Sequence, residues 1–268
     1  MRKRTFQEIA HYDKLAKAWR ENRKRDKWQG DAEFLTHSVF SSYRFCEKWM
    51  KSHIKTGESV LDYGCGNGIH SILPAKIGAK VTGVDLSQGS LAIARERAKR
   101  ERVEKQTTFL LMDCEKMTFP DDSFDMVFDG GTFSSLDIKK AIPELARVLK
   151  PDGALLAIET LGHNPLTNMK RRINKLLGRR TGWAVEHILK MDDLAFMRKY
   201  FDKVETHFFH LFSLFAFPFL SLPGGISLLR VLEKIDSLLL KIPFLQKYAF
   251  KIVIICRNPK SKAQMSNQ

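Results

Sequence analysis

The stretch that most constrains the fold runs from Val60 to Ser71, where a short apolar segment leads into a turn with glycine at alternate positions. A buried strand that ends in such a turn, with a helix after it, is the first βα unit of a nucleotide-binding sheet. Glycine permits the tight turn and lets the backbone approach a ligand with no Cβ in the way. The segment therefore predicts an α/β chain with a ligand site at the carboxyl end of its first strand.

The spacing of the glycines distinguishes this turn from a dinucleotide site. A dinucleotide site places its third glycine so that a pyrophosphate rests on a helix N-terminus, whereas the pattern here is Asp-x-Gly-x-Gly-x-Gly. The carboxylate of Asp62 would repel a phosphate but suits an ammonium group and ribose hydroxyls, which are groups of S-adenosylmethionine. We therefore predict that this cofactor contacts the turn through Asp62, Gly64, Cys65, Gly66 and Gly68.

After this turn, apolar strand-like segments alternate with helical ones. The strands are expected at residues 59–63, 80–85, 107–112, 124–129 and 154–160. Strands separated by helices of this length indicate a parallel sheet with right-handed crossovers.

Five elements in this order resemble the class I S-adenosylmethionine-dependent methyltransferases, the broad group that includes the quinone-biosynthesis C-methyltransferases and many small-molecule enzymes. The first of these elements is the glycine turn, and the other four are Val81–Ser87, Asp113 after the third strand, Phe124–Asp129 and Leu149–Gly153. The resemblance covers about residues 55–160. The resemblance implies a Rossmann-like, seven-stranded, mostly parallel sheet flanked by helices. It also implies an antiparallel pair at the end of the sheet, for which residues 204–211 and 250–257 are suited.

The resemblance gives roles to residues at the ends of the other strands. Asp85 is placed to accept hydrogen bonds from both ribose hydroxyls, and Leu86 to pack on the adenine. Asp113 would accept the adenine amino group, with the backbone N–H of Cys114 near the ring. Asp129 would face either the methionyl end of the cofactor or the acceptor. The competing interpretation is that these aspartates only stabilise turns.

Candidate acceptor-site residues follow the fifth strand, at Glu159, His163 and His187, among the arginines at 171, 172, 179 and 180. A histidine that titrates near neutral pH is a suitable base for a hydroxyl or amine acceptor. Our hypothesis is that His163 or His187 is that base and that the arginines bind an anionic group. The alternative is that Glu159 and His163 only hold the loop in place and that the arginines are solvated.

The chain is expected to have three parts. Residues 1–57 form a helical segment that either covers the carboxyl end of the sheet as a lid or packs on its flank. Residues 58–258 form the methyltransferase domain, with insertions at 162–189 and 215–245 that shape the acceptor site. The polar tail, 259–268, is expected to be disordered.

The net charge of +15 is unevenly distributed, because residues 58–150 carry −1 whereas residues 1–57 carry +7 and residues 151–268 carry +9. An anionic acceptor, an anionic membrane surface or nucleic acid would suit this basic excess, and so would ordinary solubility. Against nucleic acid, Asp129–Thr132 lacks the Pro-Pro-aromatic motif of base amino-group methyltransferases, no cysteine follows a proline, and no RNA-binding motif is present.

The four cysteines contain no CxxC pair and no histidine at metal spacing, so we predict reduced thiols, no metal site and a cytoplasmic location. No signal peptide is evident, and the most apolar segment, Phe208–Leu222, is shorter than the roughly 20 residues of a spanning helix. The phenylalanine-rich region 208–245 is expected to be core or a homodimer face; the alternatives are a peripheral membrane contact or a surface that admits a lipophilic acceptor.

These patterns favour an enzyme that transfers a methyl group from S-adenosylmethionine to oxygen, nitrogen or carbon of a small or lipophilic metabolite. A cofactor-binding protein without turnover, or an enzyme that acts on RNA or another macromolecule through its basic surface, is the alternative. Aminopropyl transfer, which enzymes of the same fold also catalyse, is a more remote alternative.

Overall fold

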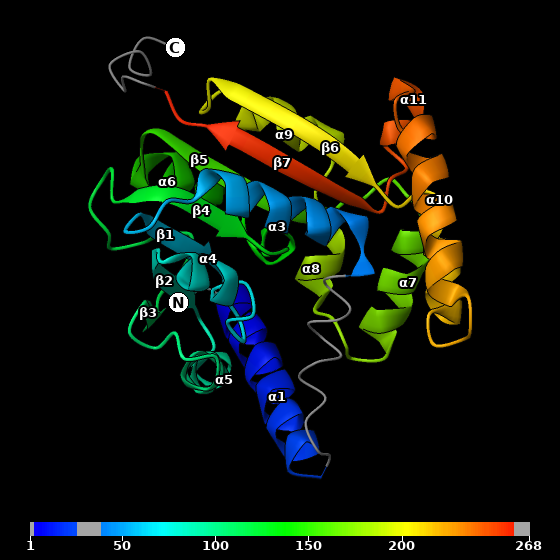
Figure 1. Cartoon of the computed structure of the whole chain (residues 1–268). Coiled ribbons are helices and arrows are strands. Elements are labelled where there is room, and N and C mark those ends of the chain that lie inside the picture. Colours follow the sequence, from blue (N-terminus) through cyan, green and yellow to red (C-terminus); the bar gives the residue numbers. More distant parts are fainter. Residues whose placement is uncertain (1–2, 26–38, 260–268) are drawn as a thin grey trace.

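The structure is a computed structural model that describes residues 3–25 and 39–259. The expected disordered tail therefore lies, but for residue 259, outside the described residues. At the centre is a seven-stranded sheet with the strand order β3-β2-β1-β4-β5-β7-β6 (Figure 1). The strands are β1 Ser59–Tyr63, β2 Lys80–Asp85, β3 Thr107–Leu111, β4 Phe124–Asp129, β5 Leu149–Thr160, β6 Lys203–Phe209 and β7 Lys251–Arg257.

The first five strands are parallel, and β7 is antiparallel to both β5 and β6. This arrangement confirms the predicted Rossmann-like sheet with its closing antiparallel pair. Helices cover both faces. They are α3 Ser41–His53, α4 Ile72–Ile77, α5 Gln88–Arg100, α6 Ile138–Val148 and α9 Met191–Met197.

Alternation along the strands produces two apolar layers, because successive side chains of a strand point to opposite faces. In β1, Leu61 and Tyr63 join α6 and α9 on one face, whereas Val60 packs with α3, α4 and α5 on the other. In Figure 1, α3 lies in front of the sheet and α9 behind it. Burial of both faces explains why the strands are almost continuously apolar.

The two helices of the N-terminal segment take different positions. The first, α1 Lys3–Arg25, lies beside α5 and reaches the carboxyl ends of the strands, where its residues face the glycine turn. The second, α3, buries Cys46 and Met50 against the sheet. The sequence offered these two positions, over the carboxyl ends of the strands and on the flank of the sheet, as alternatives for the whole segment, and each helix takes one of them; a lid function of α1 stays a prediction.

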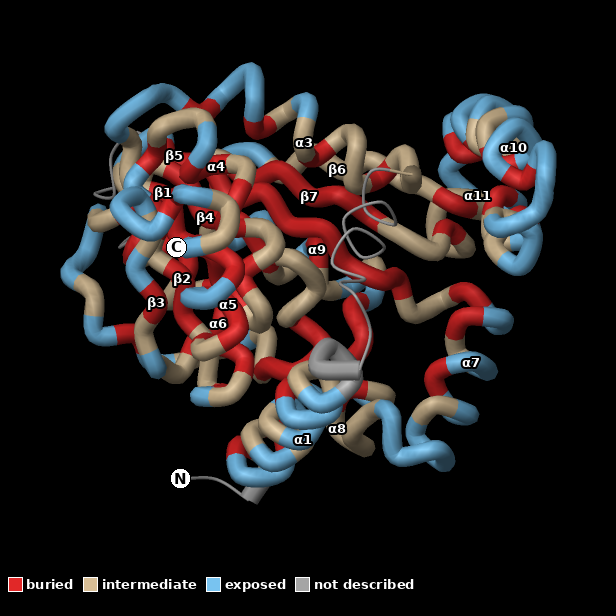
Figure 2. The backbone as a smooth tube through the Cα atoms, turned by 60° about the horizontal axis from the view of Figure 1, so that its bottom comes forward, coloured by how far each residue is buried: buried red, intermediate tan, exposed pale blue. Residues whose placement is uncertain are grey.

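The two insertions form helices at one end of the molecule. After β5 come α7 Pro165–Leu176 and α8 Gly182–Glu186; between β6 and β7 come η2 Ser213–Phe219, α10 Gly225–Leu239 and α11 Pro243–Gln246. Both α7 and α10 project beyond the sheet (Figure 2). The remaining short helix, η1 Phe133–Ser135, follows β4. Within the described ranges, no helix is both long and apolar enough to cross a membrane.

Candidate active site

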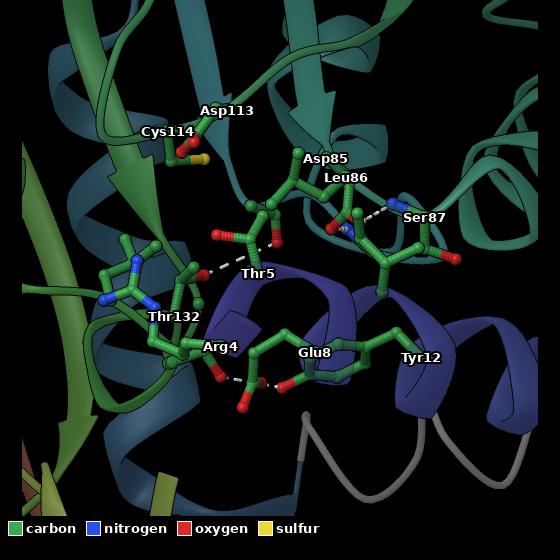
Figure 3. Close-up of a pocket in the computed structure, with 17 residues that line it drawn as sticks. Arg4, Thr5, Glu8, Tyr12, Asp85, Leu86, Ser87, Asp113, Cys114 and Thr132 are labelled. Carbon is green, nitrogen blue, oxygen red and sulfur yellow. Dashed lines mark hydrogen bonds between the residues drawn. The ribbon is translucent and has the colours of Figure 1, made fainter. Parts of the chain in front are cut away.

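A cavity of about 220 Å³ lies between α1 and the carboxyl ends of β1, β2, β3 and β4. Figure 3 shows side chains of α1 facing those that follow the strands. The lining comprises five residues of α1 and twelve from the strand ends: Arg4, Thr5, Glu8, Ile9, Tyr12, Gly64, Gly66, Asp85, Leu86, Ser87, Asp113, Cys114, Gly130, Gly131, Thr132, Ser135 and Leu136. Six of the ten residues predicted to contact the cofactor are in this lining.

The glycine turn brings the backbone of β1 to the cavity. Gly64 and Gly66 have positive φ angles of 65° and 51°, which residues with a side chain rarely adopt. A Cβ at Gly64 would come within 2.4 Å of the Thr132 side chain, whereas a Cβ at Gly66 would meet nothing within 4 Å. The backbone at Gly66 is therefore open to a ligand.

Asp85 ties the turn to the next helix from the end of β2. Its Oδ2 accepts the backbone N–H of Gly66 at 2.9 Å, and its Oδ1 accepts that of Ser87 at 2.8 Å. Burial raises the pKa of Asp85, and the nearby charge of Asp13 adds to the rise. A carboxylate has four acceptor positions, so Asp85 retains capacity for the hydroxyls of a ribose.

Asp113 and Cys114 follow β3 on the other side of the cavity. Asp113 Oδ1 accepts the backbone N–H of Glu115 at 2.9 Å, and the Tyr63 hydroxyl donates to the carbonyl of Cys114 at 2.8 Å. Leu86, next to Asp85, adds an apolar side chain to the same lining. Carboxylates that accept, an apolar face and an open glycine backbone fit the hydroxyls, adenine and amino groups of S-adenosylmethionine.

Asp62, Cys65 and Gly68 lie behind the turn and are not part of the lining. Asp62 is only 2% exposed, accepts a 2.5 Å hydrogen bond from the Ser71 hydroxyl, and has its pKa raised by burial to about 7. A Cβ at Gly68 would lie 2.7 Å from Cβ of Ala94. These residues shape the turn from beneath, rather than facing the cavity as the sequence suggested.

Asp129 and Glu159 form a buried carboxyl pair behind the loop that follows β4. Burial and the charge of Glu159 raise the pKa of Asp129 well above its usual range, and burial raises that of Glu159. Asp129 accepts the N–H of Thr132 at 3.0 Å, and Glu159 accepts that of Phe133 at 2.6 Å. Since neither carboxyl lines the cavity, the pair positions the loop from Gly130 to Thr132.

The two histidines proposed as bases also lie away from the cavity. His163 Nε2 accepts the backbone N–H of Met191 at 3.1 Å, so its ring joins the loop after β5 to the start of α9. His187 is exposed, stacks on Trp183 and lies 3.0 Å from the Trp183 carbonyl through Nδ1. Neither histidine lines this cavity, although His187 lines a neighbouring one that shares Leu136 with it, and a base at either position stays a prediction.

The arginines expected to bind an anion also lie outside this cavity, although Arg171 and Arg172 together line a separate one. Arg171 is buried and donates to the carbonyl of Ala184, which connects α7 to α8. Burial lowers the pKa of Arg171 to about 10, so the side chain remains a cation near neutral pH. None of the four predicted arginines lines the cavity.

The residues missed by the sequence analysis are those that α1 supplies. Arg4, Thr5, Glu8, Ile9 and Tyr12 share one helical face and so reach the cavity together. Arg4 forms an ion pair with Glu115 and lies over the Trp183 ring, and the Tyr12 hydroxyl is 3.0 Å from that of Ser135. In the sequence, the only sign that these residues line a site was that polar side chains recur one helical turn apart on a face that also carries apolar ones.

Glu8 differs from its neighbours on this face. It is 5% exposed, yet neither of its carboxylate oxygens has a hydrogen-bond partner in the described structure. An unpaired buried carboxylate carries a large desolvation cost. The cavity therefore contains an acceptor of hydrogen bonds that a ligand can satisfy.

Comparisons with known proteins match the central part of the chain to a protein family. Residues 61–157 match the family described as methyltransferase domain. A ribosomal protein L11 methyltransferase of Burkholderia cenocepacia is 38% identical over 113 residues, which are 42% of this chain and 35% of that protein. The chain thus spans about a third of the length of the curated relatives it matches.

Two solved structures share the fold over most of the chain. The phosphoethanolamine N-methyltransferase 2 of Haemonchus contortus, with phosphomonomethylethanolamine and S-adenosylhomocysteine, has a TM-score of 0.58 at 22% identity and covers 80% of this chain and 52% of its own. The geranyl diphosphate C-methyltransferase of Streptomyces coelicolor A3(2), with Mg²⁺, geranyl diphosphate and S-adenosyl-L-homocysteine, has a TM-score of 0.55 at 16% identity and covers 82% and 78%.

The fold is that of the class I S-adenosylmethionine-dependent methyltransferases. Within that class, residues 61–157 carry the methyltransferase domain. S-adenosylmethionine is the cofactor of this class, and the open backbone at Gly66 with the carboxylates of Asp85 and Asp113 fits it.

Proposed function

We propose that the chain transfers the methyl group of S-adenosylmethionine to a small molecule that binds under α1 and carries an amine or a hydroxyl. The observation that carries this proposal is Glu8, whose buried carboxylate faces the cavity without a partner. An N–H or O–H of the acceptor would satisfy those oxygens. Since burying an unpaired carboxylate is costly, such an acceptor is favoured over one without a donor.

The chain's own residues divide the work by position. Bound S-adenosylmethionine supplies an electrophilic methyl group on its sulfonium. Asp85 and Asp113 would hold the ribose and the adenine, and the Gly64–Gly66 backbone would lie against the cofactor. Tyr12 and Glu8 would orient the acceptor from α1, while Ile9 helps to exclude water, so alignment and desolvation provide most of the catalysis.

The charges around the cavity support an amine or hydroxyl more than an anionic acceptor. Arg4 is the one Lys or Arg in the lining, and its guanidinium already pairs with Glu115. The match to the ribosomal protein L11 methyltransferase covers 42% of the chain. It therefore says little about the acceptor, and a protein acceptor remains the alternative.

The test has a binding step and a turnover step. Isothermal titration calorimetry of the full chain with S-adenosylhomocysteine should show saturable binding, and a panel of amines and hydroxylated metabolites should release S-adenosylhomocysteine from S-adenosylmethionine. Asp85→Asn should weaken binding by about tenfold or more, because one acceptor oxygen becomes a donor. Asp152→Asn, at an exposed residue near the start of β5 and outside the cavity lining, is the matched control. An absence of binding heat in the wild type would refute the proposal.

A further inference from the structure

The exposed apolar side chains of this protein are concentrated at one end. Twenty large apolar residues are exposed in the described part of the chain, and sixteen of them fall between Leu166 and Phe244. Isolated exposed apolar residues are normal on a monomer, whereas a concentration of them marks an interaction site. The two insertions, which supply α7, η2 and α10, carry nearly all of this surface.

The exposed residues follow helical spacing in each segment. In α7 and the residue at its end, they are Leu166, Met169, Ile173, Leu176 and Leu177; in and around η2, Phe212, Phe215, Phe219 and Leu222; in α10 and beyond, Ile226, Leu228, Val231, Ile235, Leu238, Ile242 and Phe244. Steps of three and four residues place such side chains on one helical face. We call this set the apolar docking surface.

The orientation of α10 is fixed by buried contacts on its other side. Asp236 is 2% exposed and accepts the backbone N–H groups of Leu211, Phe212 and Ser213 at 2.7 to 3.0 Å, and Leu229 is fully buried. The helix therefore cannot turn its exposed stripe inward without leaving three N–H groups and a carboxylate unpaired. Figure 2 shows α10 standing at the edge of the molecule with most of its length exposed.

The charges beside this surface are predominantly cationic. Residues 165–180 contain six Lys or Arg and no Asp or Glu. On α7, Lys170 and Arg172 are exposed, and Lys234 and Lys241 are exposed on and after α10. The two acids of residues 211–250 are engaged, because Asp236 is buried and Glu233 pairs with Arg44 and Arg230.

We propose that α7, η2 and α10 bind the chain to the surface of an anionic lipid bilayer, with the apolar docking surface in the interface and the cations among the headgroups. Helices with an apolar face and a Lys/Arg-rich polar face lie in this way at membrane interfaces. A second copy of the chain is the less favourable occupant, since it would bring two cation-only stretches together. The inference is independent of the proposed function.

Vesicle co-sedimentation of the full chain provides the test. The protein should pellet with vesicles of phosphatidylcholine containing roughly one-third phosphatidylglycerol, and much less with phosphatidylcholine alone. Added salt should weaken the binding without abolishing it, because apolar burial contributes beside the charges. A wild type that stays in the supernatant with the anionic vesicles would overturn the proposal.

Two double variants probe separate helices of the docking surface. Ile235→Glu/Leu238→Glu on α10 and Ile173→Glu/Leu176→Glu on α7 should each lower the partition constant by about tenfold or more. The control is Lys105→Glu, which makes the same change in net charge at an exposed residue just before β3, at the opposite edge of the sheet. This variant should lower the partition constant far less. Circular dichroism melts identify any variant that loses its fold.

Two further outcomes would contradict the proposal. Vesicle binding by both folded double variants that equals the wild type would show that the docking surface is not used. Light scattering that shows a wild-type dimer, dissociated by the same substitutions, would assign the surface to a second copy instead.

Discussion

The helices α1 and α10 depart in opposite ways from the usual pattern, in which charged side chains are exposed and large apolar ones are buried. On α1 a carboxylate, Glu8, is buried without a partner, whereas on α10 an apolar stripe from Leu228 to Leu238 is exposed. Buried polar groups and exposed apolar patches are the informative exceptions to ordinary partitioning. The contrast supports a different proposed occupant for each helix, one small and polar, the other extended and apolar.

The sharpest test of this contrast compares two neighbouring leucines of α10. Leu229 is fully buried and Leu228 is 42% exposed. Leu229→Ala should lower the free energy of unfolding by about 4 kcal/mol, because it leaves a cavity, and Leu228→Ala should change it by less than about 0.5 kcal/mol. Urea unfolding measures both; equal losses would mean that the stripe of α10 is part of the core.

A second test uses acid to loosen the α10 side through His210. Buried His210 lies within 3.0 Å of the hydroxyls of Ser42 and Ser213, joining α3 to η2. Burial lowers its pKa to about 4, opposed by Glu233 and Asp236 and assisted by Lys251 and Arg44. Because the unfolded chain binds the proton near pH 6.5, stability should fall as pH drops from about 6.5 to 4, by at most roughly 3 kcal/mol.

His210→Asn should remove this pH dependence, since Asn tolerates the positive φ of 64° and does not titrate. His187→Asn, at an exposed histidine, is its control. Unfolding free energies measured at several pH values report the difference. The same slope in wild type and His210→Asn would locate the acid sensitivity elsewhere.

A third test addresses Glu8. Glu8→Gln should lower kcat/KM for the acceptor by about a hundredfold, close to 2.7 kcal/mol, because a neutral amide replaces a charge-assisted acceptor. Glu21→Gln, at an exposed position of the same helix, should have no effect. Calorimetry with S-adenosylhomocysteine should be unchanged for Glu8→Gln. A parallel loss of that affinity would place Glu8 on the cofactor instead of the acceptor.

The smallest effect is expected for the surface pair at the far end of α1. Arg20 and Glu96 approach to 2.9 Å but are 40% and 50% exposed, so solvent screens the pair. Arg20→Ala should alter stability by less than about 0.5 kcal/mol, as measured by thermal melts. A larger loss would show that α1 is held along its whole length and not mainly around the cavity.

Much of the sheet could be predicted from local patterns. Glycine recurs where β1 ends, and apolar runs mark the strands, so the positions of Asp85 and Asp113 at the strand ends followed directly. Contacts between distant segments left no such pattern. That Glu8 faces the cavity depends on the packing of α1 against α5, and that His163 bonds Met191 depends on the path of the loop after β5.

Helix faces were predicted less well than helix positions. Within the insertion at 215–245, apolar spacing alone does not separate Leu229 from Leu228 and Ile235, but the structure buries Leu229 and exposes the other two. The buried side is set by Asp236, which caps η2. A carboxylate with three backbone partners outside its own helix cannot be recognised from helical spacing.

One chain of hydrogen bonds joins the glycine turn to α1. Gly66 donates to Asp85, which also accepts from Ser87, and the Ser87 hydroxyl donates to Asp13 of α1 at 2.5 Å. A ligand that steadies Asp85 therefore also steadies the helix that closes over it. Backbone amides of α1 should therefore exchange hydrogen more slowly once S-adenosylhomocysteine is bound.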